Sequence, residues 1–318
     1  MALTKWRDRA HGPWPRWMVS HLGHSRVRVL VRGLVLSPDE VEIGNSSRAG
    51  SVADRMTSTA DATISALRST HDELAAVVRD LTDEQLLDQS GASEWPVAQV
   101  LSHLGSGAEI GRATLAAATG EGEVPGDGFN QSVWDRWNAM SPREQADAFV
   151  ESDEALVAAF EALTAEQRSE LQVSLGYLPR PLPVGAYAGM RLNEAAQHSW
   201  DARVAHDDDA AIADDTASLV VEHYSTGLGF LLGYIGKADA LGEPALVTLG
   251  DLGVSLSVTD TVALVPTNGV APTATLDGPP DAVARLLTGR LTPRWTPDGV
   301  TVTGNVDLDD LRRVFPGF

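Results

Sequence analysis

Apolar residues recur at helical spacing through the middle of the chain, from residue 58 to about residue 240. The first amphipathic segment has its apolar positions at Ile64, Leu67, Leu74, Val77 and Leu81. Positions separated by three, four or seven residues lie on one face of an α-helix. The pattern therefore predicts a helix that ends near Asp80.

Four further segments show the same periodicity, and polar loops separate them. These segments cover residues 95–118, 142–163, 184–206 and 216–235. Two of the loops are distinctive, since residues 120–128 are rich in glycine and acids and residues 176–183 are rich in proline. Glycine and proline interrupt helices, so these loops mark the limits of the segments. Four or five helices joined in this way favour an antiparallel bundle with one long connection.

The pattern changes after Gly242, where short stretches alternate between apolar and polar residues. Residues 245–249 and 254–258 are two such stretches, and the turn Gly-Asp-Leu-Gly between them is typical of a β-hairpin. Further strands are predicted at residues 262–265, 273–276 and 300–302, and helices at residues 281–287 and 308–315. We expect an antiparallel sheet with helices on one face. The fold prediction is a helical bundle over residues 56–240, followed by a small α+β domain over residues 241–318.

The first 55 residues do not share these patterns. They contain nine Lys and Arg against five Asp and Glu, whereas the whole chain has a formal net charge of −20. Residues 27–35 are apolar but interrupted by arginines, and no small-residue cleavage site follows, so a signal peptide is not indicated. A disordered basic arm, an amphipathic surface-binding segment and translated sequence upstream of the true start are three open interpretations. We favour the last, with a start at Val52 or Met56, and expect residues 1–55 to be poorly ordered.

Composition narrows the chemistry that is available. The chain has no cysteine, which excludes disulfides, thiolate metal sites and cysteine nucleophiles, and leaves His, Asp and Glu as metal ligands. Any thiol chemistry must therefore use an external thiol. The acidic body of the chain disfavours binding to nucleic acids. No stretch approaches the roughly 20 apolar residues of a membrane span, so we expect a cytoplasmic protein that does not bind membranes.

The sharpest local feature is a glutamate followed four residues later by a histidine, Glu194 and His198, within a predicted helix. Side chains at this spacing lie on one helix face, about 5–6 Å apart, so both can bind one metal ion. His103 is the best third ligand, because it lies among leucines on the core side of its own predicted helix. Spacing alone leaves two alternatives open: a solvated hydrogen bond within the pair, and an ordinary core histidine at position 103.

Two longer stretches extend this pattern. Residues 94–104 read Glu-Trp-Pro-Val-Ala-Gln-Val-Leu-Ser-His-Leu, and residues 192–203 read Leu-Asn-Glu-Ala-Ala-Gln-His-Ser-Trp-Asp-Ala-Arg. Both resemble signature stretches of the mycothiol-dependent maleylpyruvate isomerase family, part of the DinB-like superfamily of up-down four-helix bundles. The resemblance runs from about residue 57 to the C-terminus. It implies that His103, Glu194 and His198 are the ligands of a zinc ion.

We interpret several other residues as structural rather than as metal ligands. Trp95, Trp200 and Asp201 also fall on family positions, and Asp201 could orient a ligand histidine, as carboxylates beside metal ligands often do. His71 lies next to Asp72 and another acid on an amphipathic helix, so we expect it at the surface.

An arginine near the end of the chain is a further candidate. Residues 286–290 resemble a family stretch whose arginine helps to bind the carboxylate of substrate or cofactor, which implies a catalytic or cofactor-binding role for Arg290. The alternative is a helix that ends at Gly289, with Arg290 facing solvent. Arg294, four residues further on, is a rival for the same role.

The resemblance implies a divalent metal, with zinc the expected ion, and mycothiol as a thiol cofactor. The predicted function is isomerisation or S-transfer on a small electrophilic substrate. One alternative is a metal-dependent hydrolase of the same fold, in which bound water replaces the thiol. Another is a non-catalytic protein that binds a metal or a thiol. The patterns leave the substrate and the oligomeric state open, because members that share a metal site differ in their reactions.

Overall fold

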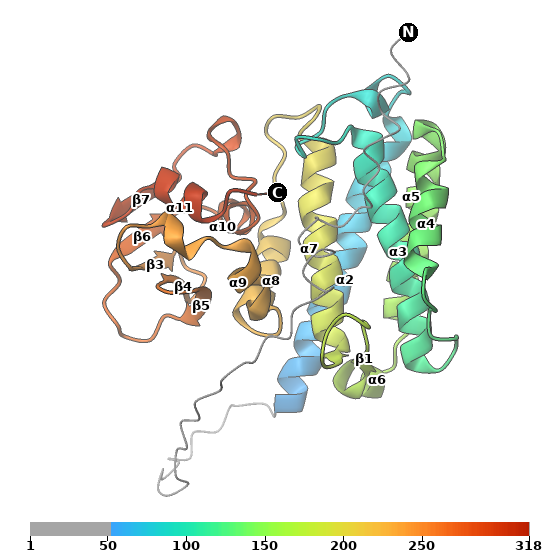
Figure 1. Ribbon diagram of the computed structural model, residues 1–318, viewed down its shortest axis with the longest axis horizontal. Helices are drawn as coiled ribbons and strands as arrows, with labels where there is room; N and C mark the ends of the chain where they lie inside the picture. The colour runs from blue at the N-terminus through green and yellow to red at the C-terminus, as the bar shows by residue number, and fades with distance from the viewer. Residues whose placement is uncertain (1–51, 318) are drawn as a thin grey trace, which may run out of the picture.

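The computed structural model describes residues 52–317, with side chains from residue 58 onward, so the expectations about residues 1–51 lie outside the described residues. A bundle of long helices lies beside a smaller part built around a β-sheet (Figure 1). The first described helix, α2, begins at Val52, within the stretch expected to be poorly ordered.

Four long helices form the bundle. They are α2 (Val52–Asp80), α3 (Val97–Thr119), α5 (Pro142–Glu161) and α7 (Val184–Arg203). Helix α3 packs along α5, and α2 packs along α7. Local sequence sets several of the boundaries: Ser141 and Glu144 form a capping box at the start of α5, and Gly120, with φ of 80°, ends α3. The four bundle helices predicted from hydrophobic periodicity are confirmed, and their predicted ends agree to within a few residues.

Shorter elements connect these helices. They are η1 (Gln85–Leu87), α4 (Phe129–Asn138), α6 (Ala165–Glu170), β1 (Gln172–Val173) and β2 (Leu182–Pro183). The periodicity did not predict α4, which lies along α3. A Cβ atom at Gly105 would stand 2.1 Å from the ring of Trp137, so the glycine of α3 is required for this close approach of α4.

The predicted helix over residues 216–235 is wrong as one continuous element. It divides into α8 (Asp214–Ser225), the 3₁₀ turn η2 (Gly229–Leu231) and α9 (Leu232–Ile235). The break lies at Thr226, whose φ and ψ of −126° and −109° are not helical. A Cβ atom at Gly227 would lie 3.0 Å from the side chain of Ala186 on α7, so the bend brings the backbone close to the bundle.

The smaller part contains a five-stranded sheet of order β5-β4-β3-β6-β7. Its strands are β3 (Ala245–Leu249), β4 (Val254–Val258), β5 (Val262–Pro266), β6 (Ala274–Asp277) and β7 (Thr301–Gly304). The expectation of an antiparallel sheet is wrong at one pair, because β3 and β6 run parallel and the β4–β5 hairpin lies between them in the sequence. The remaining elements are η3 (Ala238–Ala240), α10 (Pro280–Leu287), η4 (Pro293–Trp295) and α11 (Leu308–Val314).

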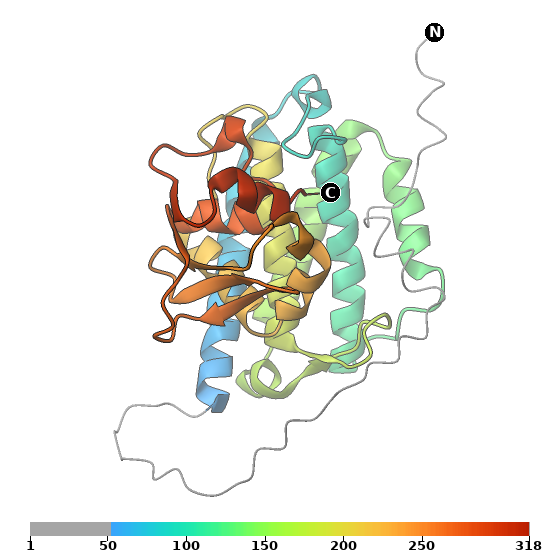
Figure 2. The same ribbon diagram turned by 60° about the vertical axis from the view of Figure 1, so that its left-hand side comes forward.

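One cluster of buried apolar side chains runs through both parts of the molecule. It joins Leu192 of α7 to Val247 of β3 and Leu286 of α10, and in Figure 2 α7 lies directly behind the sheet part. A second cluster, which includes Leu101 and Trp137, lies within the bundle alone. None of the helices in residues 52–317 is both long and apolar enough to cross a membrane.

Candidate metal centre

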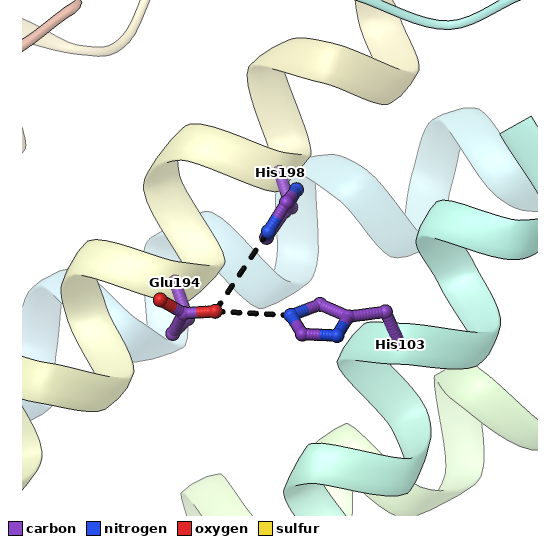
Figure 3. A group of neighbouring side chains, drawn as sticks. All are labelled: His103, Glu194 and His198. Carbon is purple, nitrogen blue, oxygen red and sulfur yellow. Dashed lines mark hydrogen bonds and ion pairs between the residues drawn. The ribbon is translucent and has the colours of Figure 1, made fainter. Parts of the chain in front are cut away.

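Helices α3 and α7 bring three candidate ligands together. His103 comes from α3, and Glu194 and His198 come from successive turns of α7 (Figure 3). The Oε2 atom of Glu194 lies 3.0 Å from Nε2 of His103 and 3.7 Å from Nε2 of His198. The two imidazole rings meet edge to face, with centroids 4.6 Å apart.

The donor set fits a divalent metal ion. One atom from each of His103, Glu194 and His198 lies within 4.8 Å of the other two. Two imidazole nitrogens and one carboxylate oxygen are typical of zinc sites that keep an open coordination position. His103 and His198 are almost fully enclosed, whereas one third of the Glu194 side chain is exposed, so the cluster opens to solvent on the glutamate side.

A buried carboxylate binds the Nδ1 atom of His198. Its Nδ1 atom lies 2.8 Å from Oδ2 of Asp201, which is completely buried one turn further along α7. An ionised carboxylate only accepts hydrogen bonds, so the shared proton belongs to Nδ1 of His198. The Nε2 atom then carries the lone pair and points toward Glu194, which is the orientation that a metal ligand needs.

The charges of the cluster suit a cation. Burial alone raises the pKa of Glu194, but the hydrogen bond with His103 and the electrostatic interactions with both histidines outweigh it, and this pKa falls to about 2. Burial lowers the pKa of His103, which favours its neutral form. At neutral pH the cluster therefore offers an anionic oxygen beside neutral imidazole nitrogen, and both are states that bind metal ions.

Trp95 forms a wall against both histidines. Its ring centroid lies 5.1 Å from that of His103 and 5.8 Å from that of His198. The backbone oxygen of Trp95 accepts a 2.7 Å hydrogen bond from the Ser90 hydroxyl, and the Gly91 amide donates to the Asp201 carbonyl at 2.8 Å. The loop before α3 is thereby tied to α7, which places the tryptophan over the cluster.

Arg290, the arginine singled out in the sequence, also lies at this centre. Its guanidinium makes a two-pronged ion pair with Asp201, at 3.0 Å from Nε to Oδ1 and 2.7 Å from Nη2 to Oδ2. The rival, Arg294, pairs with the exposed Asp208 at 3.0 Å. Of the two arginines, Arg290 is therefore the one in contact with the cluster, through the carboxylate behind His198.

A second group of charged residues lies between α2, α5 and α7. His71 of α2 donates from Nδ1 to Asp153 of α5, 2.9 Å away, and Arg191 of α7 donates to the same carboxylate. The expected surface position of His71 is wrong, because only 3% of this residue is exposed. Arg191 also donates to the carbonyl of Leu104 at 3.0 Å, next to His103.

Sequence reasoning missed this second group, although a signal was present. Asp153 is a charged residue on the apolar face of α5, between Phe149 and Leu156, and all three are buried. His71 likewise falls between the buried Leu67 and Leu74 on α2. A charged or polar residue at a core position of a helix calls for a buried partner.

The helical part also matches a known protein family. Residues 67–203 match the family model described as Mycothiol maleylpyruvate isomerase N-terminal domain. This range contains α3 and α7 and therefore all three candidate ligands. The chain thus contains this domain, which confirms the resemblance seen in the sequence. No curated protein matches the chain significantly.

Two solved structures share the fold over most of the chain. One is described as the crystal structure of the mycothiol-dependent maleylpyruvate isomerase, and the other as a histidine-to-alanine mutant of it. Each superposes with a TM-score of 0.52 and 15% sequence identity, and covers 78% of this chain and 94% of the other. At this identity the likeness establishes the fold, with a helical region followed by a mixed sheet and helices.

Proposed function

We propose that this protein is a metal-dependent enzyme that uses mycothiol for isomerisation or S-transfer on a small electrophilic substrate. His103, Glu194 and His198 would hold one divalent ion, with zinc the expected metal. The observation that carries the proposal is the convergence of the three donors from two helices, with His198 backed by Asp201. The match of residues 67–203 to the mycothiol maleylpyruvate isomerase N-terminal domain supports mycothiol as the thiol.

A divalent metal at this position supplies positive charge that favours the thiolate form of a bound thiol at neutral pH. The protein's own residues prepare the site for that charge. Asp201 keeps the proton on Nδ1 of His198, so that Nε2 faces the centre. Glu194, with its pKa of about 2, would contribute the one negative charge among the three candidate ligands to a bound divalent ion.

The surroundings of the donors match this role. Trp95 lies against both imidazoles and limits the access of water to them. Glu194 lies on the exposed side of the cluster, where an incoming molecule would meet it. The chain has no cysteine, so the sulfur nucleophile must come from a separate molecule. An external thiol that enters from the glutamate side would use the exposed face of the cluster and would supply the sulfur that the chain lacks.

Metal content is the first test of the proposal. Protein purified without chelator, and supplied with Zn²⁺, is expected to hold about one zinc per chain by elemental analysis. His198→Ala should lose the zinc, because one of three ligands is removed. His206→Ala is the matched control, since His206 lies near Asp88 at 3.8 Å, outside the donor cluster, and this variant should keep its metal. A wild-type protein that binds no zinc would overturn the metal site.

Thiol dependence is the second test. The zinc-loaded protein is assayed with maleylpyruvate and with a general electrophile such as 1-chloro-2,4-dinitrobenzene, each with and without mycothiol. Turnover that requires mycothiol and disappears in His198→Ala would support the proposed chemistry. Turnover of ester or amide substrates without any thiol would instead favour the hydrolase alternative. Zinc and mycothiol binding without turnover of any substrate would favour a binding protein.

A further inference from the structure

We propose that Arg290 is a positioning residue of the metal centre, which holds Asp201 and, through it, the ligand His198. By this contact the C-terminal part of the chain sets the metal affinity of a site built in the bundle. The inference rests on the proposed metal site and goes beyond it. It assigns part of the metal affinity to a residue about 90 positions away from His198 in the sequence.

The contact between Arg290 and Asp201 is strong and directional. Nε of Arg290 lies 3.0 Å and 3.1 Å from the two carboxylate oxygens of Asp201, and Nη2 lies 2.7 Å from Oδ2. Asp201 is completely buried, and 15% of the Arg290 side chain is exposed. A planar guanidinium bound in this way fixes the plane of the carboxylate as well as its charge.

Arg290 reaches His198 through Asp201. Its Nη2 atom lies 3.4 Å from Nδ1 of His198, but this nitrogen already donates its proton to Asp201 and has no lone pair to offer. The guanidinium therefore makes no hydrogen bond to the imidazole. Its influence on the ring passes through the orientation of the Asp201 carboxylate.

The loop that carries Arg290 is itself fixed on α7. The Arg290 amide donates to the carbonyl of Arg285 at 2.7 Å, and the Arg285 side chain makes a buried ion pair with Asp281. The Arg285 guanidinium also lies over the ring of Trp200, 4.8 Å from its centroid. Trp200 is the neighbour of Asp201 on α7, so α10 is anchored beside the residue that Arg290 holds.

A second anchor lies on the other side of His198. The Gln197 side chain donates to the carbonyl of Ala284 in α10 at 3.1 Å. The contacts of α10 and its following loop with α7 therefore flank His198 at Gln197 and at Asp201. Because binding equilibria that share a structural contact are reciprocal, metal binding at His198 should in turn stabilise the docking of α10.

Zinc affinity tests the proposal directly. Arg290→Ala is expected to weaken Zn²⁺ binding by about 10–100-fold, the usual cost of removing a residue that orients a metal ligand. The affinity is measured by competition with a chromophoric chelator. Arg294→Ala is the matched control, since Arg294 lies in the same segment and pairs with an exposed aspartate, and it should bind zinc as the wild type does. Wild-type affinity in Arg290→Ala would overturn the proposal.

A double-mutant cycle tests whether Arg290 acts through Asp201. Asp201→Asn alone should weaken zinc binding, and adding Arg290→Ala to it should cause no further loss. Equal effects of Arg290→Ala in both backgrounds would show that the arginine acts on the metal independently of Asp201, and would overturn the proposed route. Arg290→Lys keeps the charge but not the two-pronged geometry, so it should fall between wild type and alanine, and it carries the test if the alanine variant does not fold.

A measurement on metal-free protein separates this inference from the proposed function. The ¹⁵N chemical shifts of His198 report which ring nitrogen carries the proton. At a pH high enough to keep the ring neutral, wild type and Arg294→Ala should show the single Nδ1–H form, and Arg290→Ala should show a mixture of the two forms. An unchanged single form in Arg290→Ala would overturn the positioning role. A wild type that binds no zinc would overturn the proposed function, while the ¹⁵N result would still decide the role of Arg290.

Discussion

Two histidine clusters of the bundle are built on the same plan. Between α3 and α7, His198 donates from Nδ1 to the buried Asp201, and an arginine pairs with that carboxylate. Between α2 and α5, His71 donates from Nδ1 to the buried Asp153, and again an arginine pairs with the carboxylate. In both clusters the other ring nitrogen, Nε2, points toward a glutamate.

The clusters differ in what surrounds that second nitrogen. Nε2 of His198 faces Glu194 and a second imidazole, and the cluster opens to solvent at Glu194. Nε2 of His71 lies 3.1 Å from Glu154, and Arg68 already donates to both oxygens of that glutamate. One donor atom each from His71, Asp72 and Glu154 also lies within 4.8 Å of the others. The Arg68 guanidinium is thus a resident cation beside these carboxylates, and we expect it to hinder metal binding there.

From this comparison we infer that an oriented histidine is only the first condition for a metal site. The second is a carboxylate beside it that no arginine already binds. In the cluster between α2 and α5, Arg68 binds Glu154 and Arg191 binds Asp153, so we expect this cluster to act as a structural bridge. Its arginine, Arg191, lies one turn before Glu194 on α7 and donates to the Leu104 carbonyl beside His103. It therefore helps to fix the two helices that carry the candidate ligands against each other.

The strongest way to break the bridge is to remove the negative charge of Asp153. Burial alone raises the pKa of Asp153, but the charge of Arg191 and the hydrogen bond from His71 outweigh it, so the carboxylate is ionised at neutral pH. Asp153→Asn would leave the buried Arg191 without its counter-ion, and we expect a loss of about 3–5 kcal/mol of unfolding free energy in urea denaturation.

The control for this variant is an exposed pair. Asp83 pairs with Arg143 at 2.8 Å on the surface, so Asp83→Asn should cost less than about 1 kcal/mol. Similar small losses in both variants would mean that the bridge between α2, α5 and α7 does not stabilise the bundle.

A third buried histidine differs from His71 and His198, because its partner is a hydroxyl and not a carboxylate. His223 of α8 lies 2.8 Å from the Thr63 hydroxyl, and burial lowers its pKa to about 4. The unfolded chain binds a proton at this residue below about pH 6.5, whereas the folded chain does so only near pH 4, so stability is present above pH 6.5 and is lost as the pH falls.

We expect this effect to remove about 2 kcal/mol of unfolding free energy between pH 7 and pH 5. Urea denaturation of the wild type and of His223→Gln at both pH values measures it. The glutamine variant should be less stable at pH 7 but should lose less on acidification. Equal losses in the two proteins would assign the pH dependence to other groups.

The smallest expected effect concerns the resident cation of the second cluster. Arg68→Ala removes the guanidinium that donates to Glu154 and Glu161. We expect the zinc-loaded variant to bind a second divalent ion at His71, Asp72 and Glu154, more weakly than the first. Isothermal titration with Zn²⁺ detects it, and Arg168→Ala, which breaks an exposed pair with Asp61, is the control. If no second ion binds, the guanidinium is not what excludes a metal there.

Much of the fold could be predicted because its signals are local. Helical periodicity and the capping sequence of α5 define the bundle helices within short windows. Glu194 and His198 form a site motif for the same reason, since one turn of helix separates them. His103 could be predicted as the third ligand from its position on the apolar side of α3, because a buried imidazole needs a partner.

The features that escaped prediction depend on contacts between distant segments. The parallel pairing of β3 with β6 depends on the path of the hairpin between them, and the local alternation is the same for either direction. The same holds for the ion pairs of Arg191 with Asp153 and of Arg290 with Asp201, which join residues 38 and 89 positions apart. A sequence pattern shows that such a residue needs a partner but not which one it finds.

The apolar cluster that runs from α7 into the sheet also bears on how the protein unfolds. If the sheet separated from the bundle, Leu192 on one side and Val247 and Leu286 on the other would lose part of a common core. Each part would then expose apolar surface that the other normally covers, at a cost that grows with the area exposed. We therefore expect one cooperative unfolding transition, in which the boundary near residue 240 separates two kinds of secondary structure but not two folding units.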